Sequence, residues 1–433
     1  MKYYSTNKSV AEVSLKEAVT KGLADDKGLF MPERIEAFPP SFFKNIHQLS
    51  FQEISFEVAK KFFGEDIPEN ELKHIVYDTL SFDCPVVHVS RNIYSLELFH
   101  GPTLAFKDVG GRFMARLLAY FLKGNTGQVN VLVATSGDTG SAVANGFLGV
   151  PGIHVYVLYP KGLVSEIQEK QFTTLGQNIT AIEIDGTFDD CQRLVKTAFL
   201  DQELKNALTL TSANSINVAR FLPQAFYYFN AYARLQEKGM PGDLVISVPS
   251  GNFGNLTAGL FAKKMGLPVK RFIAANNEND IVYQYLQSGK YEPRASVATI
   301  ANAMDVGDPS NFARILDLYG HSHEAISTDI KGFRYSDAQI REAVNEVYHK
   351  YAYLTDPHGA TGYKALEEDL HEGETGVFLE TAHPAKFTET VEQIIGKGKV
   401  PLPEKLAEFM KGEKLSVPMS KEFDDFKAFL LKQ

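Results

Sequence analysis

Strand-like and helix-like segments alternate along this chain from residue 96 to residue 381. Segments with helical periodicity separate six runs rich in β-forming residues: 128–135, 152–160, 178–184, 243–250, 269–277 and 375–381. Strands that alternate with helices pair in parallel and are covered by helices on both faces. Because 433 residues are too many for one hydrophobic core, we predict an α/β fold with two open sheets flanked by helices.

The first 95 residues follow a different pattern. Segment 14–24 has a helical composition, 25–33 is rich in turn residues, and 51–63 and 70–80 are amphipathic at helical spacing. We predict that 1–95 forms a mostly helical N-terminal region.

Composition excludes several classes of protein. The net charge is −9, and no dense block of lysine and arginine is present, which disfavours a nucleic-acid surface. No run reaches 18 apolar residues, and the start lacks the apolar core of a secretory signal. Cys84 and Cys191 are too few for a disulfide framework, so we expect both to pack as reduced thiols. A cytoplasmic protein without membrane or nucleic-acid partners is predicted.

Lys107 stands between an aromatic turn and an apolar helix. Apolar residues at 113, 114, 117, 118 and 121 predict that helix, with Asp108 as its N-cap. A lysine just before a helix meets the positive end of the helix dipole, and this disfavours the ammonium form. A neutral amine can attack an aldehyde to form an imine. The alternative is a lysine that extends into solvent.

The segment 250–255, Ser-Gly-Asn-Phe-Gly-Asn, joins a predicted strand to a predicted helix over 255–266. Its two glycines allow a ligand to approach the backbone closely, and N–H groups at a helix start bind anions. The spacing fits neither the dinucleotide-binding pattern nor the P-loop. It predicts a phosphate site, although a plain strand-to-helix turn is the alternative.

Three further segments carry polar groups. Ser136 and Thr139 follow a strand and offer hydroxyls suited to a carboxylate, while Asn217 and Arg220 are spaced to share one helix face and could bind a phosphate. Thr381 ends a strand at the sheet edge where ligands of α/β folds bind. A lysine, a phosphate site, a carboxylate site and a lone hydroxyl together fit pyridoxal 5'-phosphate acting on an amino acid.

These segments resemble the threonine synthase family, in its longer bacterial and fungal type. The resemblance covers the whole chain and rests on MKYYSTN, KGLADDKGLFMPE, HGPTLAFKD, ATSGDTGSA, PSGNFGN and TAHPAKF. It implies the fold-type II architecture of pyridoxal-phosphate enzymes, similar to tryptophan synthase β. The implied domains are an N-terminal domain of 1–95, a large cofactor-binding domain of 96–125 and 213–433, and a small domain of 126–212.

The resemblance also implies the roles of individual residues. Lys107 would bind the cofactor aldehyde, and Thr381 would bind the pyridine nitrogen. The cofactor phosphate would be held by Gly251, Asn252, Phe253, Gly254 and Asn255. The substrate carboxylate would meet Ser136, Gly137, Asp138, Thr139 and Gly140. Asp138 departs from the wider pattern, where asparagine is frequent, so its role stays open. Asn217 and Arg220 are the candidates for the substrate phosphate, with Lys161 and Lys170 as alternatives.

The implied reaction converts O-phospho-L-homoserine and water into L-threonine and phosphate. Alternatives are a pyridoxal-phosphate-dependent phospho-lyase or dehydratase, and a binding module that retains the cofactor without turnover. A metalloenzyme is disfavoured, because His321 and His323 lack a third ligand at a suitable spacing. His100, His358 and His383 lie near the motifs without an assigned catalytic role. We expect a small-molecule substrate and either a monomer or a homodimer.

Overall fold

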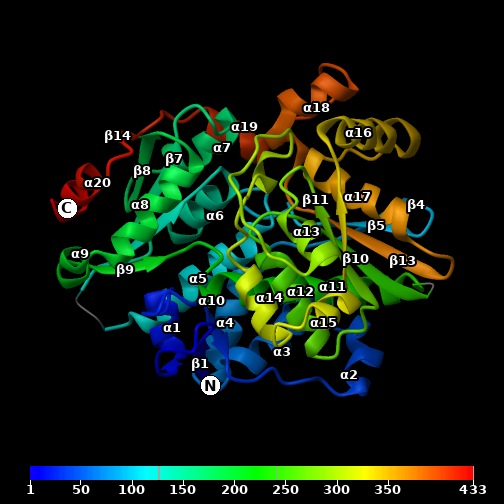
Figure 1. The fold of residues 1–433 in the computed structure, drawn as a ribbon, viewed down its shortest axis with the longest axis horizontal. Coiled ribbons are helices and arrows are strands. Elements are labelled where there is room, and N and C mark those ends of the chain that lie inside the picture. Colours follow the sequence, from blue (N-terminus) through cyan, green and yellow to red (C-terminus); the bar gives the residue numbers. More distant parts are fainter. Residues whose placement is uncertain (125–126, 241, 433) are drawn as a thin grey trace. The chain divides into compact units, whose positions relative to one another are not determined.

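The computed structural model describes residues 1–124, 127–240 and 242–432. Two compact units share the chain: unit 1 comprises 1–31, 107–220 and 402–433, and unit 2 comprises 32–106 and 221–401. Figure 1 draws the chain coloured along its sequence. The domain division implied by the resemblance stays a prediction.

Unit 1 is built on a parallel five-stranded sheet. The strands run in the order β14 (Val417–Ser420), β8 (Ile179–Asp185), β7 (Ile153–Pro160), β6 (Val129–Ala134) and β9 (Thr209–Ser212). The predicted strands at 128–135, 152–160 and 178–184 are therefore confirmed, whereas the two edge strands were not predicted. The edge strands have four residues each, too few for a clear pattern.

The helices of this unit range from four to 15 residues in length. They are α1 (Leu15–Lys21), α5 (Lys107–Phe121), α6 (Asp138–Phe147), α7 (Glu166–Thr173), α8 (Phe188–Leu200), α9 (Gln202–Ala207), α10 (Val218–Phe221), α19 (Glu404–Met410) and α20 (Phe423–Leu431). The last residue of α10 belongs to unit 2. Leu132, Ile182, Leu194 and Phe426 belong to the buried core between the sheet and these helices.

Helices α5 and α6 approach each other through glycines. A Cβ atom on Gly111 would lie 3.0 Å from the carbonyl oxygen of Ala142, and one on Gly146 would lie 3.1 Å from the carbonyl oxygen of Gly111. Real side chains rarely tolerate such distances, so the two backbones pack directly against one another.

Short strands accompany the helices of the N-terminal region. β1 (Lys2–Ser5) lies between β2 (Val13–Ser14) and β3 (Phe30–Pro32) in a small sheet. The predicted amphipathic helices are confirmed as α3 (Phe51–Phe63) and α4 (Glu69–Thr79). Ser50 and Glu53 form a capping box at the start of α3, which fixes where that helix begins.

Unit 2 is built on a six-stranded sheet. The strands run in the order β12 (Ile330–Arg334), β11 (Arg271–Asn276), β10 (Asp243–Pro249), β13 (Glu374–Glu380), β5 (Ile93–Glu97) and β4 (Val86–Ser90). All neighbours are parallel except β4 and β5, which form an antiparallel hairpin. The predicted strands at 243–250, 269–277 and 375–381 are confirmed, whereas β12 and the hairpin were not predicted.

Helices and short 3-10 turns complete this unit. The helices are α2 (Pro40–Asn45), α11 (Ala225–Glu237), α12 (Gly254–Lys264), α13 (Ile281–Ser288), α14 (Phe312–Leu318), α15 (His323–Asp329), α16 (Asp337–Tyr351), α17 (Pro357–Asp369) and α18 (Thr388–Ile395). The 3-10 turns are Ile46–Gln48, Leu222–Gln224, Asn302–Met304 and Pro384–Phe387. Helix α17 packs on β10 and β13. All three elements are labelled in Figure 1. Because β10 and β13 are parallel neighbours, their carboxyl ends lie side by side.

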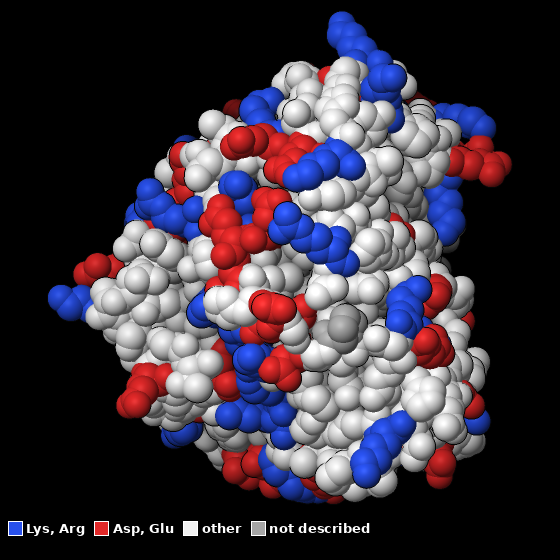
Figure 2. Space-filling view, turned by 90° about the vertical axis from the view of Figure 1, so that its right-hand side faces the viewer, with Lys and Arg blue, Asp and Glu red and all other residues white. Residues whose placement is uncertain are grey.

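The surface carries both signs of charge. On the face drawn in Figure 2, lysine and arginine side chains are interspersed with aspartate and glutamate side chains. No helix within the described ranges is long and apolar enough to cross a membrane. Cys84 and Cys191 are buried and form no disulfide, as predicted.

Candidate active site

The turn between β10 and α12 presents a row of unbonded backbone donors. The five N–H groups of 251–255 donate to no acceptor within the described part of the chain. Gly251 has φ 149° and Phe253 has φ 55°, both in the region that glycine favours. Ser250 Oγ is buried here without a hydrogen-bond partner among the described residues. Buried donors without acceptors indicate that this turn is built to hold an anion.

Surrounding groups hold the turn in place. The Asn252 amide oxygen accepts a hydrogen bond from the Ser310 N–H at 3.3 Å, and its carbonyl oxygen accepts one from the Asn311 N–H at 3.2 Å. The Tyr228 hydroxyl donates to the carbonyl oxygen of Asn255 at 2.7 Å. The donors of the turn therefore face a ligand from a rigid frame.

Thr381 follows β13, the strand next to β10. It is 8 % exposed, and its hydroxyl makes no hydrogen bond within residues 1–124, 127–240 and 242–432. Its carbonyl oxygen accepts a hydrogen bond from the Phe106 N–H at 2.8 Å, and Ala105 bridges to Ala382. Lys107 is the next residue in the sequence. The structure thus brings Thr381 and the 251–255 turn to the ends of neighbouring strands.

A buried polar network supports the end of β13, and sequence reasoning missed it. The Glu380 carboxylate accepts hydrogen bonds from the Thr355 hydroxyl at 2.8 Å and the Asp356 N–H at 2.9 Å. Burial, and then the nearby Asp356 charge, raises the pKa of Glu380 well above its ordinary value. Asp356 is also the N-cap of α17, where its side chain accepts from the Gly359 N–H. The sequence Asp-Pro at 356–357 is a helix-start signal that could have located this cap.

The histidines and a lysine near this network have defined partners. His358 Nδ1 lies 3.1 Å from the Asp356 carboxylate, and its Nε2 accepts from the Ala303 N–H at 3.2 Å. His383 Nδ1 accepts from the Ala385 N–H at 3.1 Å, and burial lowers the pKa of His383 to about 4. His100 pairs with Glu97 at 2.7 Å on the exposed side. Lys386, which was not singled out, is buried and donates to the carbonyl oxygen of Thr103 at 2.8 Å.

Lys107 is the first residue of α5 in unit 1, and it is half-buried. The prediction of Asp108 as the N-cap is wrong, because the helix already begins at Lys107 and Asp108 lies inside its first turn. Arg220 donates through Nη1 to the carbonyl oxygen of Lys107 at 3.3 Å and through Nε to that of Ala213 at 2.8 Å. Burial lowers the pKa of Arg220 to about 10, and the charge of Asp108 opposes that shift.

Asn217 does not share a helix face with Arg220, so that part of the prediction is wrong. Asn217 lies before α10, and its amide donates to the carbonyl oxygens of Val19 at 2.9 Å and Ser212 at 3.1 Å. Its amide oxygen accepts from the Ala219 N–H at 3.0 Å. The side chain of Asn217 is therefore bonded to backbone groups on both its amide nitrogen and its amide oxygen.

The loop after β6 combines fixed and available groups. The Thr135 hydroxyl oxygen accepts from the N–H groups of Gly137 at 2.9 Å and Gly140 at 2.8 Å. Asp138 is buried at the start of α6 and accepts from the Gln168 amide at 2.8 Å. The hydroxyls of Ser136 and Thr139 make no hydrogen bond in the described chain. Those two hydroxyls are the groups that a ligand can use.

The remaining candidates lie at separate places. Lys161 is exposed, and Lys170 donates to the carbonyl oxygen of Gly412 at 2.7 Å. His323 Nε2 bonds to the Leu286 carbonyl oxygen at 3.0 Å, whereas His321 is exposed at φ 60°.

The residues of this site fit pyridoxal 5'-phosphate. The unbonded N–H row suits a phosphate dianion at a helix N-terminus. The Thr381 hydroxyl offers one neutral hydrogen bond at the end of the neighbouring strand. Lys107 directly follows Phe106, whose N–H donates to the carbonyl oxygen of Thr381. Residues 83–381 match the family model described as "Pyridoxal-phosphate dependent enzyme". Fold and site are those of a pyridoxal-phosphate-dependent enzyme of fold-type II.

Further comparisons identify the family within this class of pyridoxal-phosphate-dependent enzymes. Residues 2–80 match "Threonine synthase N terminus" and residues 359–430 match "Threonine synthase, C-terminal". A threonine synthase from Serratia marcescens is 46% identical over 431 residues, which cover 100% of this chain and 99% of the relative. The crystal structure of threonine synthase from Escherichia coli is 45% identical with a TM-score of 0.94 and full coverage of both chains. The pyridoxal-phosphate-bound threonine synthase from Brucella melitensis is 34% identical with a TM-score of 0.91, covering 100% of this chain and 99% of that one. The chain belongs to the threonine synthase family.

Proposed function

We propose that the protein uses pyridoxal 5'-phosphate to convert O-phospho-L-homoserine and water into L-threonine and inorganic phosphate. The observation that carries this proposal is the row of unbonded N–H groups at 251–255 in a chain of the threonine synthase family. The Thr381 hydroxyl, unbonded within the described residues, supports it from the neighbouring strand end.

The cofactor is held by three kinds of group in this proposal. The N–H groups of 251–255 bind its phosphate, the Thr381 hydroxyl binds its ring nitrogen, and Lys107 bonds covalently to its aldehyde. Support for Lys107 comes from chain connectivity, because the preceding Phe106 is hydrogen-bonded to Thr381. When bound, the cofactor supplies a conjugated ring that withdraws electrons from the substrate Cα.

Lys107 is the proposed base and acid. Its amine takes the proton from the substrate Cα, and in its protonated form it returns a proton at Cγ after a second proton has left Cβ and the phosphate has departed. The departing phosphate takes the proton that leaves Cβ. Water then adds at Cβ to give the threonine hydroxyl, and the proton that the water releases passes to the Lys107 amine and from there back to Cα. Arg220 is the proposed positioning residue for Lys107, because its guanidinium bonds the lysine carbonyl. The neutral Thr381 hydroxyl binds the ring nitrogen without adding a charge there.

The substrate carboxylate is proposed to meet the hydroxyls of Ser136 and Thr139. Asp138 is proposed to hold the shape of that loop, since its carboxylate is bonded to the Gln168 amide. Binding of the substrate phosphate by Asn217 and Arg220, or by Lys161 and Lys170, stays a prediction.

The activity is tested by incubating the purified holoenzyme with O-phospho-L-homoserine and measuring phosphate and threonine together. We expect the two products in equal amounts, and loss of both in Lys107→Ala by at least about 1,000-fold. Lys196→Ala changes an exposed lysine on α8 and should behave as wild type. Release of phosphate with a 2-oxo acid instead of threonine would point to a lyase and contradict the proposal.

The phosphate cradle is tested by comparing pyridoxal 5'-phosphate with pyridoxal, which lacks the phosphate. We expect pyridoxal to bind the apoenzyme at least about 100-fold more weakly, because five donors would then lose their acceptor. Equal affinities would rule out 251–255 as the phosphate site.

We also propose a cytoplasmic protein that is a monomer or a homodimer. Both cysteines are buried and neither forms a disulfide, which supports a reducing compartment. Light scattering on the purified protein measures the oligomeric state, and a larger assembly would contradict this part.

A further inference from the structure

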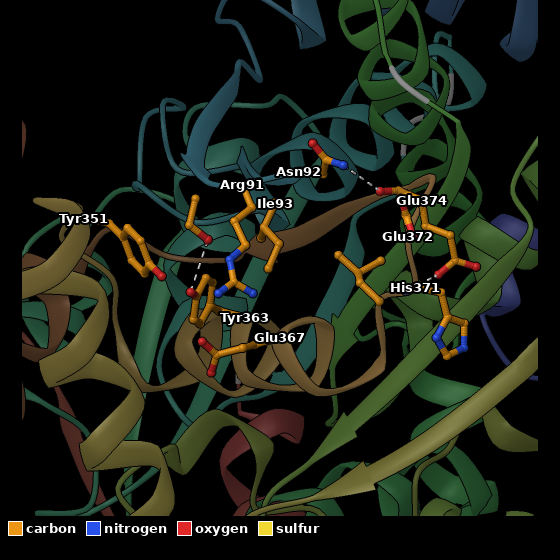
Figure 3. Close-up of a pocket in the computed structure, with 11 residues that line it drawn as sticks. Arg91, Asn92, Ile93, Tyr351, Tyr363, Glu367, His371, Glu372 and Glu374 are labelled. Atoms are coloured by element: carbon orange, nitrogen blue, oxygen red, sulfur yellow. Dashed lines mark hydrogen bonds between the residues drawn. The ribbon is translucent and has the colours of Figure 1, made fainter.

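Unit 2 contains a cavity of about 230 Å³ at the end of its sheet opposite to Thr381. It lies where β4 ends, β5 begins and β13 begins, so it opens at the edge away from the 251–255 turn. Figure 3 shows side chains of this hairpin, of α16 and of α17 around it. Pockets for drug-sized ligands measure roughly 300–1,000 Å³, so this cavity suits a smaller molecule.

Three charged side chains line the cavity without being paired to groups of the described chain, and Arg91 and Glu367 are two of them with opposite charges. The Arg91 guanidinium makes no hydrogen bond or ion pair within the described ranges, and neither does the Glu367 carboxylate. Arg91 is exposed in the β4–β5 turn, whereas Glu367 is half-buried on α17. In Figure 3 the Arg91 side chain extends toward α17, from which Tyr363 and Glu367 project. Burial raises the pKa of Glu367 and the Glu346 charge adds to this, whereas the charges of Lys364, Lys350 and Arg91 oppose the shift.

Other polar groups of the cavity are already engaged. Glu374 is bonded to Arg271 at 2.6 and 2.8 Å, which compensates its charge. The Tyr363 hydroxyl lies 3.2 Å from Ser90 Oγ. Arg91, Glu367 and the exposed Glu372 therefore remain as the charges that a ligand would meet, and Glu367 is the more buried of the two carboxylates.

Arg91 also occupies a costly backbone conformation. Its φ is 44°, in the left-handed region that glycine and asparagine favour. Such a conformation costs an arginine about 1 kcal/mol, yet this turn presents a long cation to the cavity rather than a small residue. The conformational cost at Arg91 is explained if its guanidinium binds a ligand in the cavity.

The chemistry of the cavity selects a molecule with both charges. An anion alone would be repelled by Glu367, and a cation alone by Arg91. A zwitterion satisfies both, and Arg binds carboxylates in a two-point fashion. Ile93 and Leu370 supply apolar surface for a small aliphatic side chain.

We propose that this cavity is a second binding site, separate from the catalytic one, for a small aliphatic α-amino acid. The carboxylate of the ligand binds Arg91, its ammonium group binds Glu367, and its side chain contacts Ile93 and Leu370.

The test is calorimetric titration of the holoenzyme with L-valine, isovalerate and isobutylamine. Isovalerate is valine without its amine, and isobutylamine is valine without its carboxylate. We expect valine to bind at least tenfold more tightly than either. A one-charge analogue that binds as tightly as valine would overturn the proposal.

Two variants locate the binding. Arg91→Asn removes the guanidinium with a residue that favours the left-handed turn, so the backbone is preserved. Glu367→Gln removes the carboxylate charge at the same size. Each should weaken valine binding at least tenfold, and Glu372→Gln, an exposed carboxylate at the same cavity, should not.

The cofactor absorbance separates this site from the catalytic one. Valine in the proposed cavity leaves the absorbance of wild type unchanged at concentrations that saturate the calorimetric signal. Binding that alters the absorbance and persists in Arg91→Asn would place valine at Lys107 and overturn the proposal. Valine binding at Lys107 would overturn the proposed second site, whereas a failure to form threonine would overturn the proposed function.

Discussion

At the scale of single residues, the site depends on backbone conformations that few residue types tolerate. Gly251 has φ 149°, and a Cβ there would lie 3.3 Å from the carbonyl oxygen of Ala303. Any L side chain at this position strains the turn and crowds that carbonyl group.

We expect Gly251→Ala to lower the free energy of unfolding by about 1–2 kcal/mol and to weaken pyridoxal-phosphate binding about tenfold. Urea unfolding and cofactor titration measure the two effects. Gly127→Ala is the matched control, because a Cβ at Gly127 meets nothing within 4 Å. Equal unfolding free energies and equal cofactor affinities of Gly251→Ala and Gly127→Ala would show that a side chain at position 251 does not strain the turn.

Thr381→Val keeps the shape of the side chain and removes its hydroxyl. The Phe106 N–H retains its bond to the backbone carbonyl of 381, so the strand end should stay intact. We expect about a tenfold loss in pyridoxal-phosphate affinity with little change in stability. Unchanged affinity in an equilibrium titration would exclude the hydroxyl as a partner of the cofactor.

His383 makes stability depend on pH. Its pKa of about 4 lies below the ordinary value of 6.5, so the unfolded chain binds the proton more readily. The stabilisation is present above pH 6.5 and is lost as the pH falls toward 4. Between pH 7 and pH 5, wild type should lose about 2 kcal/mol more unfolding free energy than His383→Gln. Parallel urea titrations measure this, and equal losses would contradict it.

At the scale of elements, α17 reaches the cofactor end of the sheet through its first turn. The N-cap Asp356 bonds the Gly359 N–H, and the Asp356 N–H donates to Glu380, the residue before Thr381. A Cβ on Gly359 would lie 1.6 Å from the Glu380 carboxylate. The helix start and the end of β13 therefore form one packed unit.

Asp356→Ala should cost about 1–2 kcal/mol of stability, as loss of an N-cap does, and should also weaken cofactor binding. Ser50→Ala removes the N-cap of α3 and should cost a similar stability without affecting the cofactor. Thermal unfolding and cofactor titration distinguish the two variants. Normal cofactor affinity in Asp356→Ala would show that the start of α17 does not position Thr381 for the cofactor.

Local patterns were sufficient to predict six central strands, β6, β7, β8, β10, β11 and β13, and to mark the turn at 251–255. The glycines at 251 and 254 mark the turn directly, because their backbone freedom is a property of the residues themselves. Asn217 could not be assigned in this way, since one acceptor of its amide is the carbonyl of Val19, which is distant in the sequence. The Glu380 network was not predicted for the same reason, because its partners lie at the start of α17, which is distant in the sequence. Contacts between distant segments leave no local periodicity.

At the scale of the whole molecule, cofactor binding should stabilise the fold by mass action. A cofactor present at 100 times its dissociation constant adds about 2.7 kcal/mol to the free energy of unfolding. Calorimetric scans of the apoenzyme with increasing pyridoxal 5'-phosphate should show a rising Tm, with a smaller rise for Lys107→Ala. A Tm independent of the cofactor would mean that the folded state does not bind it.

The bare contact between α5 and α6 has a mechanical consequence. Gly111 lies four residues after Lys107, and Ala142 lies four residues after Asp138, so the opening turns of the two helices touch where side chains are missing. Because no flexible side chain lies between the two backbones at this contact, we expect the helices to resist sliding past one another. The start of α5, which carries Lys107, and the loop that carries Ser136 and Thr139 should then move together when substrate binds.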